Sequence, residues 1–225
     1  MIDYRRILEE ESEPDFAAFT RKLNPGKEGI IGVRIPKIRA LAKEIIKDDW
    51  RAYLEDEPGN FEEEMLRGLV IATAPMDSTE RIALTDGFLR YVDNWATCDT
   101  FCTSWKFRKK ESDQVYGYFA SLMDTGEEFA MRVSLVSRMD HFLDEGHIDD
   151  IIDDLITYRN EGFYYKMGAA WVASFCYIKF PERTERILGT GDLEPWVNNK
   201  AIQKICESYR VSDEAKARVR GLKMA

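Results

Sequence analysis

Histidine is scarce in this sequence, because His141 and His147 are the only two among 225 residues. Two histidines near one loop leave little with which to build a Ser-His-Asp triad or a histidine-rich metal site. The Gly-Lys-Ser phosphate loop and the Gly-x-Gly-x-x-Gly fingerprint are absent as well. Most familiar enzyme classes are therefore disfavoured, and we expect neither a metal ion nor another cofactor.

The four cysteines follow no disulfide spacing, which favours reduced thiols in a cytoplasmic protein. Cys98 and Cys102 lie four residues apart without a second pair, a pattern more typical of small core residues than of metal ligands. No uninterrupted apolar run approaches the ~20 residues that span a bilayer. The first residues are charged and do not resemble a secretory signal. With 44% hydrophobic residues, we expect a globular cytoplasmic protein without membrane contact.

The charge of the chain is negative overall but unevenly distributed. Acidic residues number 41 and basic residues 32, which gives −9 at pH 7, and an acidic protein repels a polyanion. Residues 21–47, however, hold eight basic and two acidic side chains, and residues 106–110 hold four basic ones. Local potential rather than total charge decides nucleic-acid binding. Charge alone leaves two alternatives open, a DNA-binding patch and a solvated helix face.

Helical periodicity runs through most of the chain, and strand signals are nearly absent. A stripe of apolar residues begins after Pro36 and continues to Ile46. Similar stripes occur over 61–73, 79–91, 113–123, 128–139, 148–157, 163–178 and 196–209. The acidic run at 147–154 lacks the turn glycine of a calcium loop and is typical of a helix start. We therefore expect an all-α fold of roughly a dozen helices and a single domain over residues 1–225.

A local pattern of acidic, apolar and basic residues recurs along the helices. In one register its polar positions are 67, 99, 132, 166 and 200, at steps of 32, 33, 34 and 34 residues. A recurring step of this length is typical of a helical-repeat solenoid, in which residues of one phase line a concave surface. The prediction is then that one carboxylate and four cations face the same groove: Arg67, Asp99, Arg132, Lys166 and Lys200.

Trp95 and Asp99 are one helical turn apart on the same predicted face. An aromatic ring supplies a negative π-face and a carboxylate supplies a full charge, so together they suit a site that holds a cation. The alternative is a structural aspartate beside a core tryptophan. Both interpretations stay open at this point.

Four stretches of the sequence, at residues 32–43, 95–99, 131–134 and 166–171, carry a resemblance to a known family. Taken in order, they resemble the DNA alkylation repair family of AlkD-type glycosylases. The stretch from Gly32 to Lys43 is similar to that family's early signature of glycine, basic residue, proline and basic helix. Trp95-x-x-x-Asp99 is similar to its catalytic helix, Met131–Ser134 to its arginine-bearing helix, and Lys166–Trp171 to a later Lys-to-Trp motif. The resemblance covers roughly residues 25–210.

The resemblance implies a right-handed α-solenoid of HEAT-like repeats that binds duplex DNA in its concave groove. It also implies hydrolytic release of N3- or N7-alkylated purines, with Asp99 as the catalytic carboxylate. Trp95 and Trp171 take the places of the aromatic pair beside the lesion, and Arg132 takes that of the arginine that contacts the backbone. The residues expected to bind DNA elsewhere are Arg34, Lys37, Arg39, Arg67, Lys166 and Lys200.

The chemistry of such a reaction suits this composition. A purine alkylated at N3 or N7 is already cationic and leaves without protonation, so one of the two carboxylates of ordinary glycoside cleavage is not needed. A single aspartate can stabilise the oxocarbenium-like transition state. Two alternatives stay open: a non-catalytic binder of unusual DNA structures, and a repeat scaffold for a protein partner. We expect the protein to be a monomer.

Overall fold

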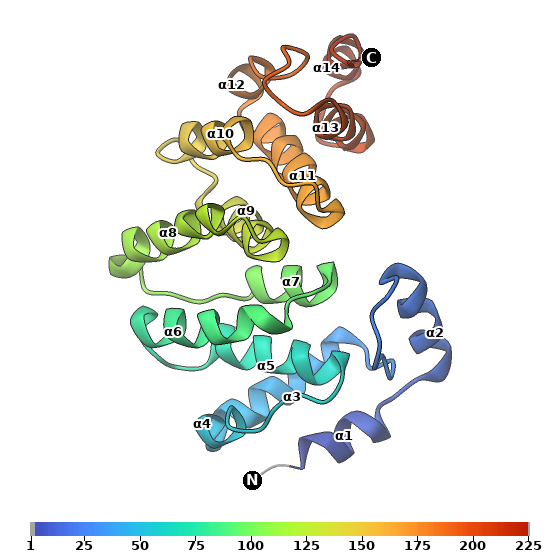
Figure 1. Cartoon of the computed structure of the whole chain (residues 1–225), viewed down its shortest axis with the longest axis vertical. Coiled ribbons are helices and arrows are strands. Elements are labelled where there is room, and N and C mark those ends of the chain that lie inside the picture. Colours follow the sequence, from blue (N-terminus) through green and yellow to red (C-terminus); the bar gives the residue numbers. More distant parts are fainter. Residues whose placement is uncertain (1–2, 225) are drawn as a thin grey trace. The chain divides into compact units, whose positions relative to one another are not determined.

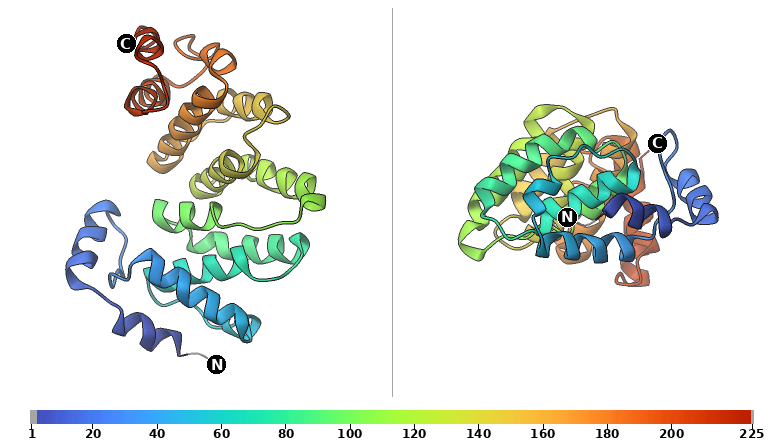
Figure 2. Two further views of the ribbon diagram at one scale, coloured as in Figure 1. Left: turned by 180° about the vertical axis from the view of Figure 1, so that it is seen from behind. Right: turned by 90° about the horizontal axis from the view of Figure 1, so that it is seen from below.

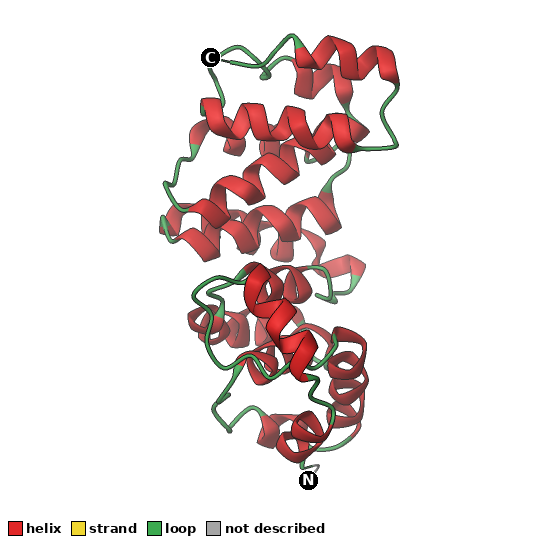
Figure 3. Ribbon diagram, turned by 90° about the vertical axis from the view of Figure 1, so that its right-hand side faces the viewer, coloured by secondary structure: helices red, strands yellow, loops and turns green. Residues whose placement is uncertain are grey.

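The computed structural model describes residues 3–224, and all regular elements in this range are helices (Figures 1 and 3). The predicted all-α class is confirmed, with fourteen α-helices between residues 3 and 224. Within the same range, no helix has both the length and the apolar character needed to cross a membrane. Contacts divide the chain into two compact units, residues 1–115 and 116–225. The single domain expected over 1–225 stays a prediction.

The first unit contains seven complete helices and the start of an eighth. They are α1 (Tyr4–Glu10), α2 (Pro14–Leu23), α3 (Ile35–Lys47), α4 (Trp50–Tyr53), α5 (Phe61–Thr73), α6 (Ser78–Phe88), α7 (Trp95–Cys102) and α8 (Ser112–Ser121). In this unit α3 packs on α5, and α5 packs on α7, as Figures 1 and 2 show. The apolar stripe predicted after Pro36 forms the buried face of α3, through Ile38, Leu41 and Ile45.

The second unit repeats this arrangement with longer helices. After α8 it contains α9 (Glu128–Phe142), α10 (Ile148–Thr157), α11 (Phe163–Lys179), α12 (Pro181–Glu185), α13 (Pro195–Glu207) and α14 (Asp213–Arg220). Here α9 packs on α11, and α11 packs on α13 (Figure 1). Eleven of the fifteen residues of α9 are buried, so this helix lies at the centre of the unit.

Several predicted ranges agree closely with the structure. The helices predicted over 61–73 and 148–157 have those bounds in the structure. Asn60 caps the start of the first of them, α5, because its side chain accepts from the Glu63 amide at 2.9 Å. The helix predicted over 79–91 ends earlier, at Phe88, and a 3₁₀ turn follows over Leu89–Tyr91. The helices α1, α2, α4, α12 and α14 carry no predicted range, because four of them are at most eight residues long and short segments show little periodicity.

A buried carboxylate holds the loop that leads into α3. Glu62 of α5 is 1% exposed and accepts from three consecutive backbone amides, those of Ile31, Gly32 and Val33, at 3.0, 2.7 and 3.2 Å. Gly32 has φ +92°, and a Cβ there would lie 2.3 Å from the Glu13 carbonyl oxygen. The glycine of the early signature therefore serves a close backbone approach.

Candidate functional site

The helix α7 presents two partly accessible residues, Trp95 and Asp99, and its other six residues are buried. Asn94 starts the helix, because its side chain accepts from the Thr97 amide at 2.8 Å. This cap places Trp95 at the first helical position and Asp99 one turn later on the same face. The two cysteines of α7, Cys98 and Cys102, are 0% exposed, which agrees with their interpretation as core residues.

The indole of Trp95 is anchored at its nitrogen. Its Nε1 donates to the carbonyl oxygen of Leu23, at the end of α2, at 2.9 Å. Nearby, Lys27 forms ion pairs with Glu64 and Asp93 at 2.6 and 2.8 Å. Burial raises the pKa of Glu64, and the ammonium group of Lys27 opposes this shift. These contacts join α2, α5 and the turn before α7, so they hold the ring of Trp95 in place.

Two of the predicted DNA-binding residues already have acidic partners. Arg34 makes a bidentate contact with Glu13 at 2.8 Å for both bonds, and Lys37 pairs with Glu11 at 3.2 Å. The hydrogen bonds from Arg34 lower the pKa of the Glu13 carboxyl group. All four side chains are solvent-accessible, and exposed pairs of this kind contribute little to stability. A phosphate group can therefore replace either carboxylate at low cost.

Arg67 forms hydrogen bonds with backbone carbonyl groups of its own unit. Its guanidinium donates to the carbonyl oxygens of Leu54 and Asp56 at 2.8 and 2.7 Å, just after α4. It also lies 5.6 Å from the centre of the Tyr91 ring. The structure thus gives Arg67 a role in closing the end of α4.

In the second unit, Glu128 and Arg132 of α9 both hold the start of α11. Glu128 accepts from the amides of Tyr164 and Tyr165 at 2.6 and 3.3 Å, and Arg132 donates to the Tyr164 carbonyl at 2.6 Å. Arg132 is 5% exposed. Gly168 allows this packing, since a Cβ there would lie 3.3 Å from Arg132 Nη1. Arg132 is therefore a buried link between two helices.

The other predicted residues of the second unit lie on α11 and α13. Lys166 pairs with Glu161 and Glu194 at 2.7 and 3.0 Å, and the contact with Glu161 raises its pKa. Lys200 donates to Gln203 at 3.0 Å. Trp171 is half-buried and lines a cavity of about 250 Å³. The structure thus brings Arg132, Lys166 and Trp171 onto α9 and α11, which pack on each other.

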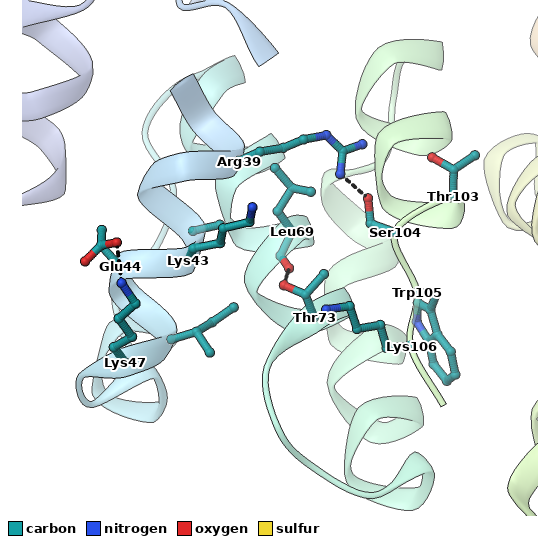
Figure 4. A pocket seen from close by; sticks show the side chains of 12 residues that line it. Arg39, Lys43, Glu44, Lys47, Leu69, Thr73, Thr103, Ser104, Trp105 and Lys106 are labelled. Atoms are coloured by element: carbon teal, nitrogen blue, oxygen red, sulfur yellow. Dashed lines mark hydrogen bonds and ion pairs between the residues drawn. The ribbon is translucent and has the colours of Figure 1, made fainter. Parts of the chain in front are cut away.

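A larger cavity, of about 670 Å³, lies between α3, α5 and the segment that follows α7. Figure 4 shows the side chains of Lys43 and Lys106 extending toward the space between these elements, and Arg39 donating to Ser104. The polar side chains of its lining are Arg39, Lys43, Glu44, Lys47, Thr73, Thr103, Ser104 and Lys106. Sequence reasoning predicted Arg39 as a DNA-binding residue and noted Lys43, Lys47 and Lys106 only as members of two basic runs. Arg39, Lys43 and Lys47 lie four residues apart along one predicted helix, and this spacing indicates a shared basic face.

Metal chemistry has no candidate centre in the part of the chain that the structure describes. Among residues 3–224, no three histidine, cysteine, aspartate or glutamate side chains lie close enough together to hold a metal ion.

In a comparison with protein families, the model described as DNA alkylation repair enzyme matches residues 4–157. This range is more than half of the chain and contains Trp95, Asp99 and Arg132, whereas Trp171 lies beyond it. A search of the curated proteins finds no match. The family match supports a role in DNA repair, with DNA as the substrate. The chain therefore belongs to the DNA alkylation repair enzyme family.

Proposed function

We propose that the protein is an alkylpurine DNA glycosylase, a hydrolase that cleaves the N-glycosidic bond of cationic N3- or N7-alkylated purines in duplex DNA. The observation that carries the proposal is the accessible edge of α7, which consists of Trp95 and Asp99. An indole face beside a carboxylate favours a positive charge next to both. The family match includes both residues and supports DNA as the ligand.

The proposed reaction needs one carboxylate and water. The C1′–N bond breaks and its electron pair goes to the purine, which neutralises the positive charge of the base. Asp99 stabilises the oxocarbenium-like sugar and orients a water molecule, which adds to C1′ and releases a proton to solvent. The ring of Trp95 would pack beside the sugar and contribute about 0.5–2 kcal/mol through its π-face.

Residues of the second unit are also proposed to contact DNA. Trp171 would be an aromatic contact, and Arg132 and Lys166 would contact the phosphate backbone. DNA has to compete there with the Tyr164 carbonyl and with two glutamates. We also propose the HEAT-like right-handed α-solenoid as the fold. The serial packing of α3, α5 and α7 in one unit, and of α9, α11 and α13 in the other, supports it.

The proposal is tested by the bases that the protein releases from duplex DNA. We expect release of 7-methylguanine and 3-methyladenine, which leave as neutral bases from cationic adducts. We expect no release of uracil from a uracil-containing duplex, because uracil departs with a negative charge unless it is protonated, whereas the cationic adduct departs as a neutral base. Equal release of uracil and 7-methylguanine would contradict the single-carboxylate mechanism.

The two alternative functions give different results in the same experiment. A protein that releases no base but loses DNA affinity steeply with salt is a non-catalytic DNA binder, since phosphate contacts give that dependence. A protein that neither releases a base nor binds DNA is a scaffold for another partner.

A further inference from the structure

The cavity of 670 Å³ is lined by four basic side chains and few acidic ones. Among residues 3–224, neither Lys43 nor Lys106 has an acidic partner, and Arg39 bonds to the hydroxyl of Ser104 at 2.8 Å. Lys47 is paired with Glu44 at 2.6 Å, and Glu44 is the one acidic side chain of the lining. The cavity therefore has an excess of positive charge.

Acidic side chains outnumber basic ones in this protein, yet the lining of the cavity holds one acidic and four basic side chains. The chain has nine more acidic than basic residues. Many accessible arginines and lysines elsewhere have a carboxylate within 3.5 Å, for example Arg34 with Glu13, Arg51 with Glu80, and Arg218 with Glu185. Like charges around one space repel each other, and a bound anion removes this repulsion.

The position of the cavity relates it to the candidate catalytic carboxylate within the same unit. Thr103 and Ser104 follow α7 directly, and the Thr103 hydroxyl donates to the Asp99 carbonyl at 2.8 Å. Thr103 lies four residues beyond Asp99, which corresponds to ~6 Å along a helix. The bond from Arg39 to Ser104 joins segments 65 residues apart and keeps α3 beside this end of α7.

The chemistry of the lining is that of a phosphate site. Lysine, arginine and hydroxyl side chains are the groups that contact the phosphates of a nucleic acid. Along α3, Arg39, Lys43 and Lys47 follow at intervals of four residues, which places them ~6 Å apart in a row on one face. A row of cations suits successive phosphates of one strand better than it suits a single small anion.

We propose that this cavity binds phosphate groups of the DNA strand beside the target nucleotide. The inference rests on the proposed function for the identity of the target, and it depends on DNA binding rather than on base release. Lys43 and Lys106 are the binding cations. Arg39, held by Ser104, is a positioning residue and a third contact.

The test compares two variants that lose the same charge. In K43Q/K106Q both cavity lysines become glutamines, and in the control K216Q/K223Q two accessible lysines outside the cavity and outside both basic runs become glutamines. DNA affinity is measured against salt concentration with an undamaged duplex. Loss of two phosphate contacts lowers the slope of log K against log salt by about 1.8. We expect this decrease in K43Q/K106Q and less than half of it in the control.

Base release provides a second readout. For K43Q/K106Q we expect the half-saturating DNA concentration to rise on the order of 10–100-fold near 0.1 M salt, with the release rate at saturating DNA unchanged. An unchanged salt slope, or an equal decrease in both variants, would overturn the inference even if the wild type releases 7-methylguanine. A wild type that releases no base would overturn the proposed function and leave the salt slope as the test of the cavity.

Free phosphate compounds are the other source of the same chemistry. Inorganic phosphate and a mononucleotide are titrated into both variants and the wild type by calorimetry. Saturable one-to-one binding that K43Q/K106Q loses, together with an unchanged DNA salt slope, would assign the cavity to a free phosphate compound and overturn the DNA assignment.

Discussion

Replacing Glu62 by glutamine perturbs the loop that leads into α3. The carboxylate is 1% exposed, and its two oxygens accept from three backbone amides, two of them on Oε1 and one on Oε2. In Glu62→Gln one oxygen becomes an NH₂ group, which cannot accept from an amide. At least one of the three bonds is lost, and the other two change from charged to neutral hydrogen bonds.

The size of the effect follows from these bonds. A hydrogen bond to a charged group contributes about 1.5–3 kcal/mol, and a neutral one about 0.5–1.5 kcal/mol. One lost bond and two weakened ones, offset by easier burial of the neutral amide, lower the free energy of unfolding by about 3 kcal/mol. For a chain of this length the midpoint of thermal unfolding falls by roughly 6–12 °C.

Urea and thermal unfolding at pH 7 measure this change. The matched control is Glu28→Gln, an exposed glutamate of the segment between α2 and α3, for which we expect a change below about 0.5 kcal/mol. If Glu62→Gln and Glu28→Gln unfold at the same urea concentration, the carboxylate does not hold the loop, and the structural role assigned to Glu62 is wrong.

Two further predictions concern the cap of α7 and a buried tyrosine. Asn94→Ala removes a cap that is 1% exposed and should lower the free energy of unfolding by about 1–2 kcal/mol. The loss should be smaller for Asp77→Ala, which removes the exposed cap of α6. Equal losses in urea unfolding would refute the importance of the burial of Asn94. Burial raises the pKa of Tyr165 to about 12, so the folded state keeps a proton that the unfolded state loses above about pH 10, and stability should fall between pH 10 and pH 12. Tyr165→Phe should remove up to about 1.4 kcal/mol per pH unit from that slope, and an unchanged slope would contradict the shifted pKa.

The helices that the sequence predicts best are those with a clear cap and a long apolar stripe. Asn60 and the stripe after it mark α5, and the acidic first turn after His147 marks α10. Periodicity is weak in α4 and α12, which have four and five residues. Asp49 caps the start of α4 and Pro181 begins α12, but a helix of about one turn is too short to show a periodic stripe in the sequence.

The candidate site divides in the same way. Trp95 and Asp99 share one face because they lie on one helix, and spacing alone predicts this. The contact of Arg34 with Glu13 depends on a loop held by Glu62, and no local pattern contains it. The cavity likewise needs Lys106 to fold back beside α3, a tertiary contact that charge counting along the chain does not reveal.

The most direct measurement is the single-turnover rate of 7-methylguanine release from duplex DNA by Asp99→Asn. This variant keeps the shape of the side chain and removes the charge that the account assigns to transition-state stabilisation. We expect the rate to fall by about 10²–10³-fold, with DNA affinity unchanged and with Asp113→Asn, an exposed aspartate of α8, at the wild-type rate. Release by Asp99→Asn at the wild-type rate would contradict the role of Asp99 as the catalytic carboxylate.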